Sequence, residues 1–146
     1  MSKFVPILAF CLFYGGAAFG GDITAGFSRD DTKNVVVDSI YKLMWQDGKE
    51  IYRGTYDEAI KYCDNLSFAG FDDWRLPTVN ELISITDKSK FNPAINSVFK
   101  YVESSDYWSS TKHIVVSSWW IVDFVYGGGG WNYGFNRSFV LCVRQY

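Results

Sequence analysis

The stretch Asp73-Trp74-Arg75-Leu76-Pro77-Thr78-Val79-Asn80-Glu81-Leu82 holds the clearest local signal in the chain. Thr78 and Glu81 stand three residues apart, which is the spacing of a capping box at the start of a helix. Pro77 disfavours helical geometry in Leu76, so the chain reaches Thr78 from an extended segment. The stretch therefore predicts a helix that begins at Thr78 and continues through the apolar residues after Glu81.

A second capping box lies upstream of this stretch. Thr55 and Glu58 have the same spacing, and a Glu at that position completes the box. Apolar residues then recur at helical intervals, at Tyr56, Ala59, Ile60, Cys63 and Leu66. This period indicates an amphipathic helix with one face on the core, and Gly70 is its expected terminator.

The remaining segments are typical of strands. Residues 34–46 predict two strands around a turn at Asp38-Ser39. From Asp106 onward, aromatic and β-branched residues predict strands at 107–111, 117–126, 131–133 and 138–144. The glycine run at 127–130 is expected to connect two of these strands, and residues 91–99 are expected to form a short third turn of helix. A hairpin, two helices and an antiparallel meander predict an α+β fold.

The first residues have the three parts of a signal peptide. Lys3 supplies the positive charge, an uncharged apolar run follows at 4–14, and Ala18-Phe19-Gly20 fits a small-x-small cleavage site. We expect residues 1–20 to be removed, 21–33 to be a lead-in and 34–146 to be the domain. The apolar run is short for a bilayer-spanning helix, so a retained anchor is the less favoured alternative. Export to the periplasm or the surface of a bacterium is the prediction, with no membrane span after cleavage.

Cysteine usage agrees with export. Cleavage would remove Cys11 and leave Cys63 and Cys142. Two cysteines in an oxidising compartment are expected to pair with each other. The alternatives are two free thiols or a redox site, although neither cysteine lies in a C-x-x-C motif.

Composition limits the classes of partner. The formal net charge of the chain is −2, so it offers no basic footprint for nucleic acid. Aromatic residues are abundant, with six Trp, ten Tyr and twelve Phe. Such residues suit both the core of a small domain and a surface that faces carbohydrate, and composition alone does not decide between these uses.

Four segments in order resemble a known family. They are Ala59-x-x-x-Cys63-x-x-Leu66, Asp73-Trp74-Arg75-Leu76-Pro77-Thr78-x-x-Glu81-Leu82, Tyr107-Trp108-Ser109-Ser110-Thr111 and Cys142-Val143-Arg144, preceded by Leu43-Met44-Trp45-Gln46. The sequence is similar to the Lcl C-terminal domain family from about residue 34 to its end. Thr55, Glu58, Asp73, Trp74, Arg75, Thr78, Glu81 and Trp108 are the expected structural residues of this pattern.

The resemblance implies a C-type-lectin-like fold, related to the formylglycine-generating sulfatase-modifying enzymes. Two helices would pack on a twisted antiparallel sheet with the chain ends close together. It also implies that Cys63 on the first helix bonds to Cys142 on the last strand. The adhesin that names the family is implicated in binding sulfated glycosaminoglycans, but the slightly negative charge of this chain does not support transferring that ligand.

No enzyme, cofactor or metal is predicted. Asp72, Asp73 and Glu81 suggest either metal ligands or an acid–base pair, but Glu81 is also the capping partner of Thr78. Asp73 lies two residues from Arg75 and is expected to brace a loop. His113 is the only histidine and has no nucleophile motif, so a place at the surface or in a turn is expected. The calcium motifs of C-type lectins and the catalytic cysteines of the related enzymes do not occur.

The candidate binding surface lies in the late aromatic region. Trp119 and Trp120 should point to opposite faces of one strand, so that one is core and the other is available to a ligand. The candidate ligand-binding residues are Trp119, Trp120, Trp131, Asn132, Tyr133, Asn136 and Arg137. The alternative is that these aromatics complete the core. Trp45, Trp74 and Trp108 are expected in the core in either case.

Three functions follow from these observations. The favoured one is an exported, non-enzymatic binding or adhesion module that recognises a glycan or a protein partner. The alternative is a structural or accessory subunit of a bacterial envelope assembly. The third is an enzyme derived from the sulfatase-modifying fold, which would need a redox-active pair of Cys63 and Cys142.

Overall fold

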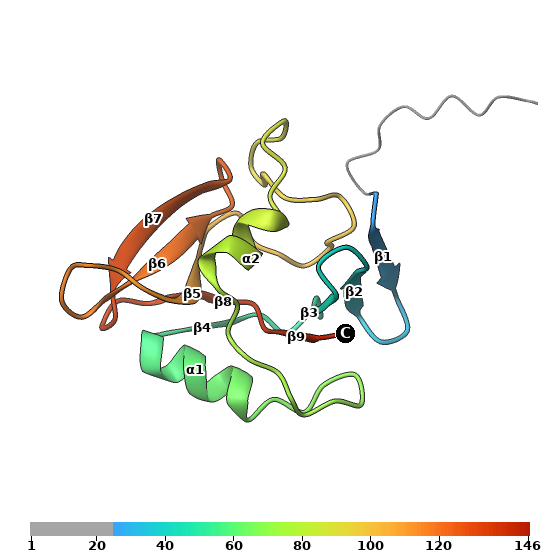
Figure 1. Cartoon of the computed structure of the whole chain (residues 1–146), viewed down its shortest axis with the longest axis horizontal. Helices are drawn as coiled ribbons and strands as arrows, with labels where there is room; N and C mark the ends of the chain where they lie inside the picture. The colour runs from blue at the N-terminus through green and yellow to red at the C-terminus, as the bar shows by residue number, and fades with distance from the viewer. Residues whose placement is uncertain (1–24) are drawn as a thin grey trace, which may run out of the picture.

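The computed structural model describes residues 25–146 as an α+β domain with two sheets (Figure 1). The predicted signal peptide lies outside the described residues. Within residues 25–146, no helix is long and apolar enough to cross a membrane. The elements in order are β1 (Phe27–Asp30), β2 (Val35–Asp38), β3 (Leu43–Gln46), β4 (Tyr52–Gly54), α1 (Tyr56–Asp64), α2 (Val79–Ser84), β5 (Asp106–Lys112), β6 (Ser118–Asp123), β7 (Gly128–Tyr133), β8 (Ser138–Val140) and β9 (Val143–Gln145).

The first sheet has the order β1-β2-β3-β9 and is antiparallel throughout. The predicted hairpin is confirmed, and its turn has a clear cause. The Asp38 carboxylate accepts hydrogen bonds from the amides of Ile40 (2.9 Å) and Tyr41 (3.0 Å). Asx turns of this kind fix the chain reversal locally. β1 falls in the predicted lead-in and pairs with β2.

The second sheet has the order β4-β8-β5-β6-β7. It is not the simple meander predicted, because β8 pairs in parallel with β5 at Tyr107 and Phe139. The single strand predicted at 138–144 is also wrong. The chain leaves the second sheet after Val140 and enters the first sheet at Val143. Between them, the Cys142 carbonyl accepts the Gln46 amide (3.0 Å), so this bend joins the two sheets.

Both capping boxes are confirmed. The Thr55 amide donates to Glu58 Oε2 (2.9 Å), and the Thr78 amide donates to Glu81 Oε1 (2.8 Å). In each box the Thr hydroxyl accepts the amide of its Glu partner. However, α1 ends at Asp64 with Asn65 as its cap. Gly70, the predicted terminator, adopts φ +84° in the turn that follows.

Two further expectations are corrected. Residues 91–99 form no helix, because their amides bond to other segments. Ala94 donates to the Phe124 carbonyl (2.7 Å) and Asn96 to the Ile85 carbonyl (3.0 Å). Three of the four glycines of the 127–130 run lie inside β7, and only Gly127, with φ +77°, occupies the turn.

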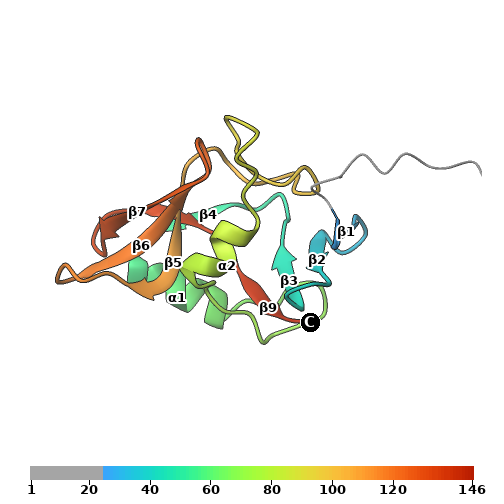
Figure 2. The same cartoon turned by 45° about the horizontal axis from the view of Figure 1, so that its top comes forward.

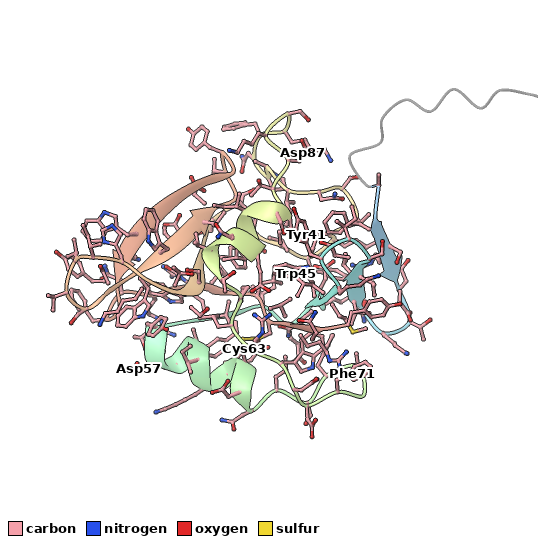
Figure 3. The ribbon with its side chains drawn as sticks, viewed as in Figure 1. Tyr41, Trp45, Asp57, Cys63, Phe71 and Asp87 are labelled. Atoms are coloured by element: carbon pink, nitrogen blue, oxygen red, sulfur yellow. A yellow bond between two sulfur atoms is a disulfide. The ribbon has the colours of Figure 1, made fainter. Side chains whose placement is uncertain are left out.

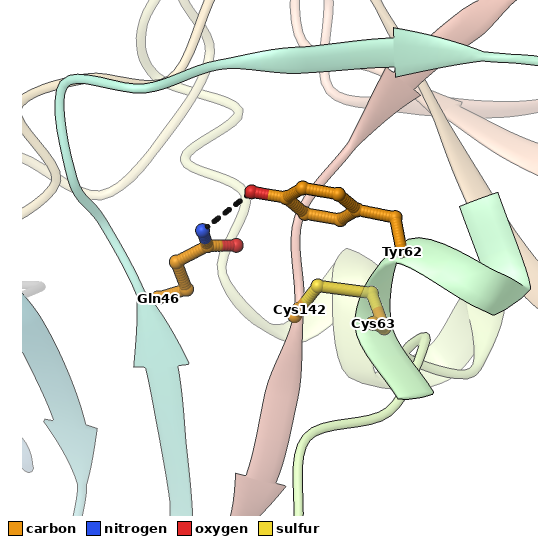
Figure 4. Close-up of a disulfide and its surroundings, with 4 residues drawn as sticks. All are labelled: Gln46, Tyr62, Cys63 and Cys142. Carbon is orange, nitrogen blue, oxygen red and sulfur yellow. Dashed lines mark hydrogen bonds between the residues drawn. A yellow bond between two sulfur atoms is a disulfide. The ribbon is translucent and has the colours of Figure 1, made fainter. Parts of the chain in front are cut away.

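The core contains the expected tryptophans. Trp45, Trp74 and Trp108 are at most 3% exposed, and Trp45 lies in the interior (Figure 3). α2 lies between the two sheets in both views (Figures 1 and 2), and its Leu82 packs with the buried apolar residues of both. The Cys63–Cys142 disulfide, with a Cα–Cα distance of 5.6 Å, fastens α1 to the bend between the sheets (Figure 4).

One carboxylate pair makes stability depend on pH. Asp106 and Asp123 stand opposite each other in β5 and β6. Burial, and then the charge of Asp123, raise the pKa of Asp106. A carboxyl whose pKa rises on folding favours the folded state at low pH, and this stabilisation is lost as the pH rises through the raised pKa.

We therefore expect Asp106→Asn to raise the free energy of unfolding by roughly 0.5 kcal/mol at neutral pH, because it removes a like-charge cross-strand pair. At pH values below the ordinary pKa of 3.8 the gain should vanish. Urea unfolding at both pH values measures this difference. An equal gain at both would show that the amide acts through packing and not through charge.

Candidate functional site

The candidate site is a row of aromatic side chains on β6 and β7. Trp120 stands opposite Trp131 in the register of these strands, so both side chains lie on one face of the sheet. Tyr133 follows two residues after Trp131 and shares that face. We call this surface, with His113 and Phe135 at its ends, the aromatic face.

Ring contacts run continuously along the aromatic face. The His113 ring meets Trp120 edge-on at 4.9 Å and lies parallel to Trp131 at 5.2 Å. Trp131 meets Tyr133 edge-on at 5.3 Å, and Tyr133 stacks on Phe135 at 5.2 Å. Trp131 is 43% exposed, Tyr133 37% and Phe135 72%. Mutual packing holds these rings in place while much of their area remains open to solvent.

The turn between β5 and β6 fixes His113 in this row. Its Nδ1 accepts the Val115 amide (3.2 Å), so the neutral ring carries its proton on Nε2. Ser118 Oγ donates to the Val115 carbonyl (2.6 Å) and closes the same turn. The prediction of a turn position is confirmed, but no feature of the sequence predicted that the ring would stack on Trp131.

The tip of this turn is strongly apolar. Ile114 is 95% exposed and Val116 82% exposed. Together they form a small exposed apolar patch, and contiguous patches of this kind are typical of surfaces that bind a partner. They extend the aromatic face with a surface that contains no ring, and sequence reasoning did not single them out.

The structure separates the predicted binding residues into two groups. Trp120, Trp131 and Tyr133 belong to the aromatic face. Trp119 points to the opposite face, as strand alternation predicted, where its ring stacks on Tyr56 at 3.8 Å. Both tryptophans are half-buried, but Trp119 packs against the buried residues around Cys63 and Cys142.

The polar residues of the prediction lie with Trp119 or in the following turn. Asn132 stands opposite Trp119 in the register and donates to Ser138 Oγ (3.3 Å). Its Oδ1 accepts the side-chain amide of Asn136 (2.6 Å). Arg137 pairs with Glu58 (3.3 Å) and donates to the Arg53 carbonyl (2.7 Å). These side chains hold the 134–137 turn against the start of α1.

Two of the three candidate carboxylates, Glu81 and Asp73, are held by arginines. The Glu81 carboxylate accepts hydrogen bonds from both terminal nitrogens of Arg75, at 2.7 and 2.8 Å. Burial alone would raise the pKa of Glu81, but the hydrogen bonds from Arg75 and the Thr78 amide lower it overall. Asp73 pairs with Arg144 (2.6 Å) and not with Arg75, which corrects the expected loop brace. Within residues 25–146, no three His, Cys, Asp or Glu side chains gather as a metal site.

The model of the Lcl C-terminal domain matches residues 34–144. The chain belongs to the Lcl C-terminal domain family. The match spans α1, α2 and every strand from β2 through the start of β9, so the aromatic face lies within the family domain. No curated protein matches the chain. Membership indicates a secreted-type module and leaves the ligand open.

Proposed function

We propose that this Lcl C-terminal domain is an exported, non-enzymatic module of the bacterial periplasm or cell surface, which binds a glycan through its aromatic face. The observation that carries the proposal is the continuous row from His113 to Phe135, in which three rings are exposed while each contacts its neighbour. A row of rings fixed by one another presents flat apolar area at little cost in side-chain entropy.

The chemistry of the row suits sugar rings. The apolar face of a sugar stacks on an indole or phenol ring, and nearby donors fix its hydroxyls. The Tyr133 hydroxyl and the His113 Nε2–H supply such donors within the row. Among the described residues, Ser118 is the serine that lies beside His113 and is therefore the candidate nucleophile. Its Oγ lies 3.3 Å from His113 Nδ1, but that nitrogen accepts the Val115 amide while the hydroxyl donates to the Val115 carbonyl. These bonds support a binding role.

Replacing Trp131 tests the proposal. A glycan array that includes sulfated glycosaminoglycan fragments and bacterial envelope oligosaccharides, probed with and without calcium, would supply a ligand. We expect Trp131→Ala to weaken binding to that ligand roughly tenfold, because the loss of one stacked ring costs about 1.4 kcal/mol. Isothermal titration calorimetry measures the change.

Two variants serve as controls. Tyr126→Ala removes an aromatic residue that is 68% exposed outside the aromatic face, and Arg137→Ala removes a predicted contact that the structure assigns to Glu58. Tyr126→Ala should bind as the wild type does. Arg137→Ala should weaken binding less than Trp131→Ala, because it loosens only the turn that carries Phe135. Equal affinity of Trp131→Ala and wild type would remove the aromatic face from consideration.

A protein partner is the second candidate, as expected for a subunit of an envelope assembly. Ile114 and Val116 at the tip favour it, because exposed aliphatic side chains suit a protein interface better than a sugar. Stoichiometric co-purification with an envelope protein, abolished by Ile114→Ser but not by Ile40→Ser, would favour this function. Ile40 is 64% exposed in the turn between β2 and β3, next to the other sheet, and is a matched control.

A further inference from the structure

β7 is the outermost strand of the second sheet and is open along its outer side (Figures 1 and 2). Proteins normally protect such edges with short strands, charges, prolines or covering elements. The other sheet edges in the described chain follow this rule. β1 carries Arg29 and Asp30, while β4 and β9 have three residues each, with Arg53 and Arg144 among them. β7 has six residues and neither a charge nor a proline.

The ladder between β6 and β7 shows which backbone groups face outward. The Gly134 amide donates to the Ser117 carbonyl (2.8 Å). Hydrogen-bonded and non-bonded pairs alternate along an antiparallel ladder. Following the register from this bond, the N–H and C=O of Gly129 and Trp131 point away from β6. Together they offer the pattern that an added strand recognises.

The glycines of β7 are not required by the fold of one chain. A Cβ on Gly128 would meet nothing within 4 Å, and one on Gly129 would come no closer than 3.9 Å to any neighbouring atom. A Cβ on Gly130 would make ordinary contact with Ile121 at 3.6 Å. None of the three has a positive φ. Glycine weakens a strand, and one role that it serves there is to let a ligand or another backbone approach closely.

We propose that β7 pairs with β7 of a second copy of this chain, antiparallel about a two-fold axis at Gly130. This axis pairs outward-facing residues with outward-facing residues and sets Trp131 opposite the partner's Gly129. The same register sets Asn132 opposite the partner's Gly128 and Tyr133 beside the partner's Gly127, in the turn before its β7. Each large side chain of one strand thereby meets a glycine of the other, so the strand is complementary to itself.

This pairing goes beyond the proposed function and does not depend on it. A two-fold axis perpendicular to the sheet leaves the aromatic faces of both copies on the same side. Two binding surfaces joined in one continuous sheet would engage a repeating ligand with higher avidity than a single copy.

Sedimentation velocity of the purified protein tests the pairing. An interface made by one strand pair is small, so we expect a weak dimer. The dimer fraction should rise from near zero to most of the protein over a roughly hundredfold increase in protein concentration. Gly129→Lys should sediment as a monomer throughout, with thermal unfolding that shows the domain intact. Ser28→Lys places the same charge on the exposed edge strand β1 and should leave the dimer unchanged.

Amide exchange locates the contact. The amides of Gly129 and Trp131 should exchange rapidly at low concentration and become protected as the dimer forms. A wild-type protein that stays monomeric, or a dimer that survives Gly129→Lys, overturns the proposal. Protection of these amides only when a foreign polypeptide is added also overturns it. Glycan binding by monomeric Gly129→Lys is a separate measurement, so failure of the dimer and failure of the proposed function are distinguishable.

Discussion

Replacing both Cys63 and Cys142 with alanine is expected to lower the free energy of unfolding by about 4.5 kcal/mol. The bond closes a loop with a sequence separation of 79 residues, and the chain-entropy argument assigns a large stabilisation to a loop of this length. Both sulfur atoms belong to fully buried residues. Alanine is therefore the suitable replacement, because a buried serine would add an unsatisfied hydroxyl. Urea unfolding of the two proteins measures the loss.

The reduced wild-type protein is the control, since it has the same sequence without the bond. Its free energy of unfolding should agree with that of the double-alanine variant to within about 1 kcal/mol. The remaining difference comes from the smaller alanine side chains. The Gln46 amide donates to the Tyr62 hydroxyl (3.0 Å) beside the bond (Figure 4). Because the sulfurs are buried, mild reductant should not open the bond in the folded protein. If the double-alanine variant were as stable as the oxidised wild type, the loop closed by the disulfide would not stabilise the fold as expected.

Features encoded by neighbouring residues were predictable from the sequence. Thr55 with Glu58 and Thr78 with Glu81 set the starts of the helices through contacts three residues apart. The turn at Asp38 is likewise local. Interactions of this range are visible in the order of residues, and for that reason the hairpin and both helix starts were predicted correctly.

Features that depend on distant residues were not predictable in the same way. The break between β8 and β9 depends on Cys142, which is held to α1 by its disulfide and to β3 through Gln46. Likewise, β7 exists because β6 supplies a ladder for its glycines, against their low strand propensity. Tertiary pairing overrode the local signal at both places.

The candidate site shows the same division. Strand alternation correctly placed Trp119 and Trp120 on opposite faces, because that period is a property of one strand. Their environments come from other elements, namely Tyr56 of α1 for Trp119 and the turn residue His113 for Trp120. Arg137 was assigned to a binding surface by residue type, and only the folded chain shows that Glu58 engages it.

Asp47→Ala should lower the free energy of unfolding by about 3–5 kcal/mol, because it removes the buried carboxylate of an ion pair and leaves Arg29 only its exposed partner, Asp31. The Asp47 side chain is fully buried, and the Arg29 side chain with which it pairs is 8% exposed. The carboxylate also accepts the amides of Lys100 (2.7 Å) and Tyr101 (3.0 Å). It thus joins β1, the end of β3 and the segment before β5. Urea unfolding provides the measurement.

Asp31→Ala is the matched control for this network. Asp31 bonds to the same arginine, Arg29 (2.6 Å), and to Lys100 (2.6 Å), but its side chain is 67% exposed. The hydrogen bonds from Lys100 and then Arg29 lower the pKa of Asp31, so its contribution is present at neutral pH and lost as the pH falls. Water and salt screen such a pair, so Asp31→Ala should have a small effect that added salt removes. If both variants lost equal stability, burial of the carboxylate would not be the cause, and the greater weight assigned to Asp47 would be wrong.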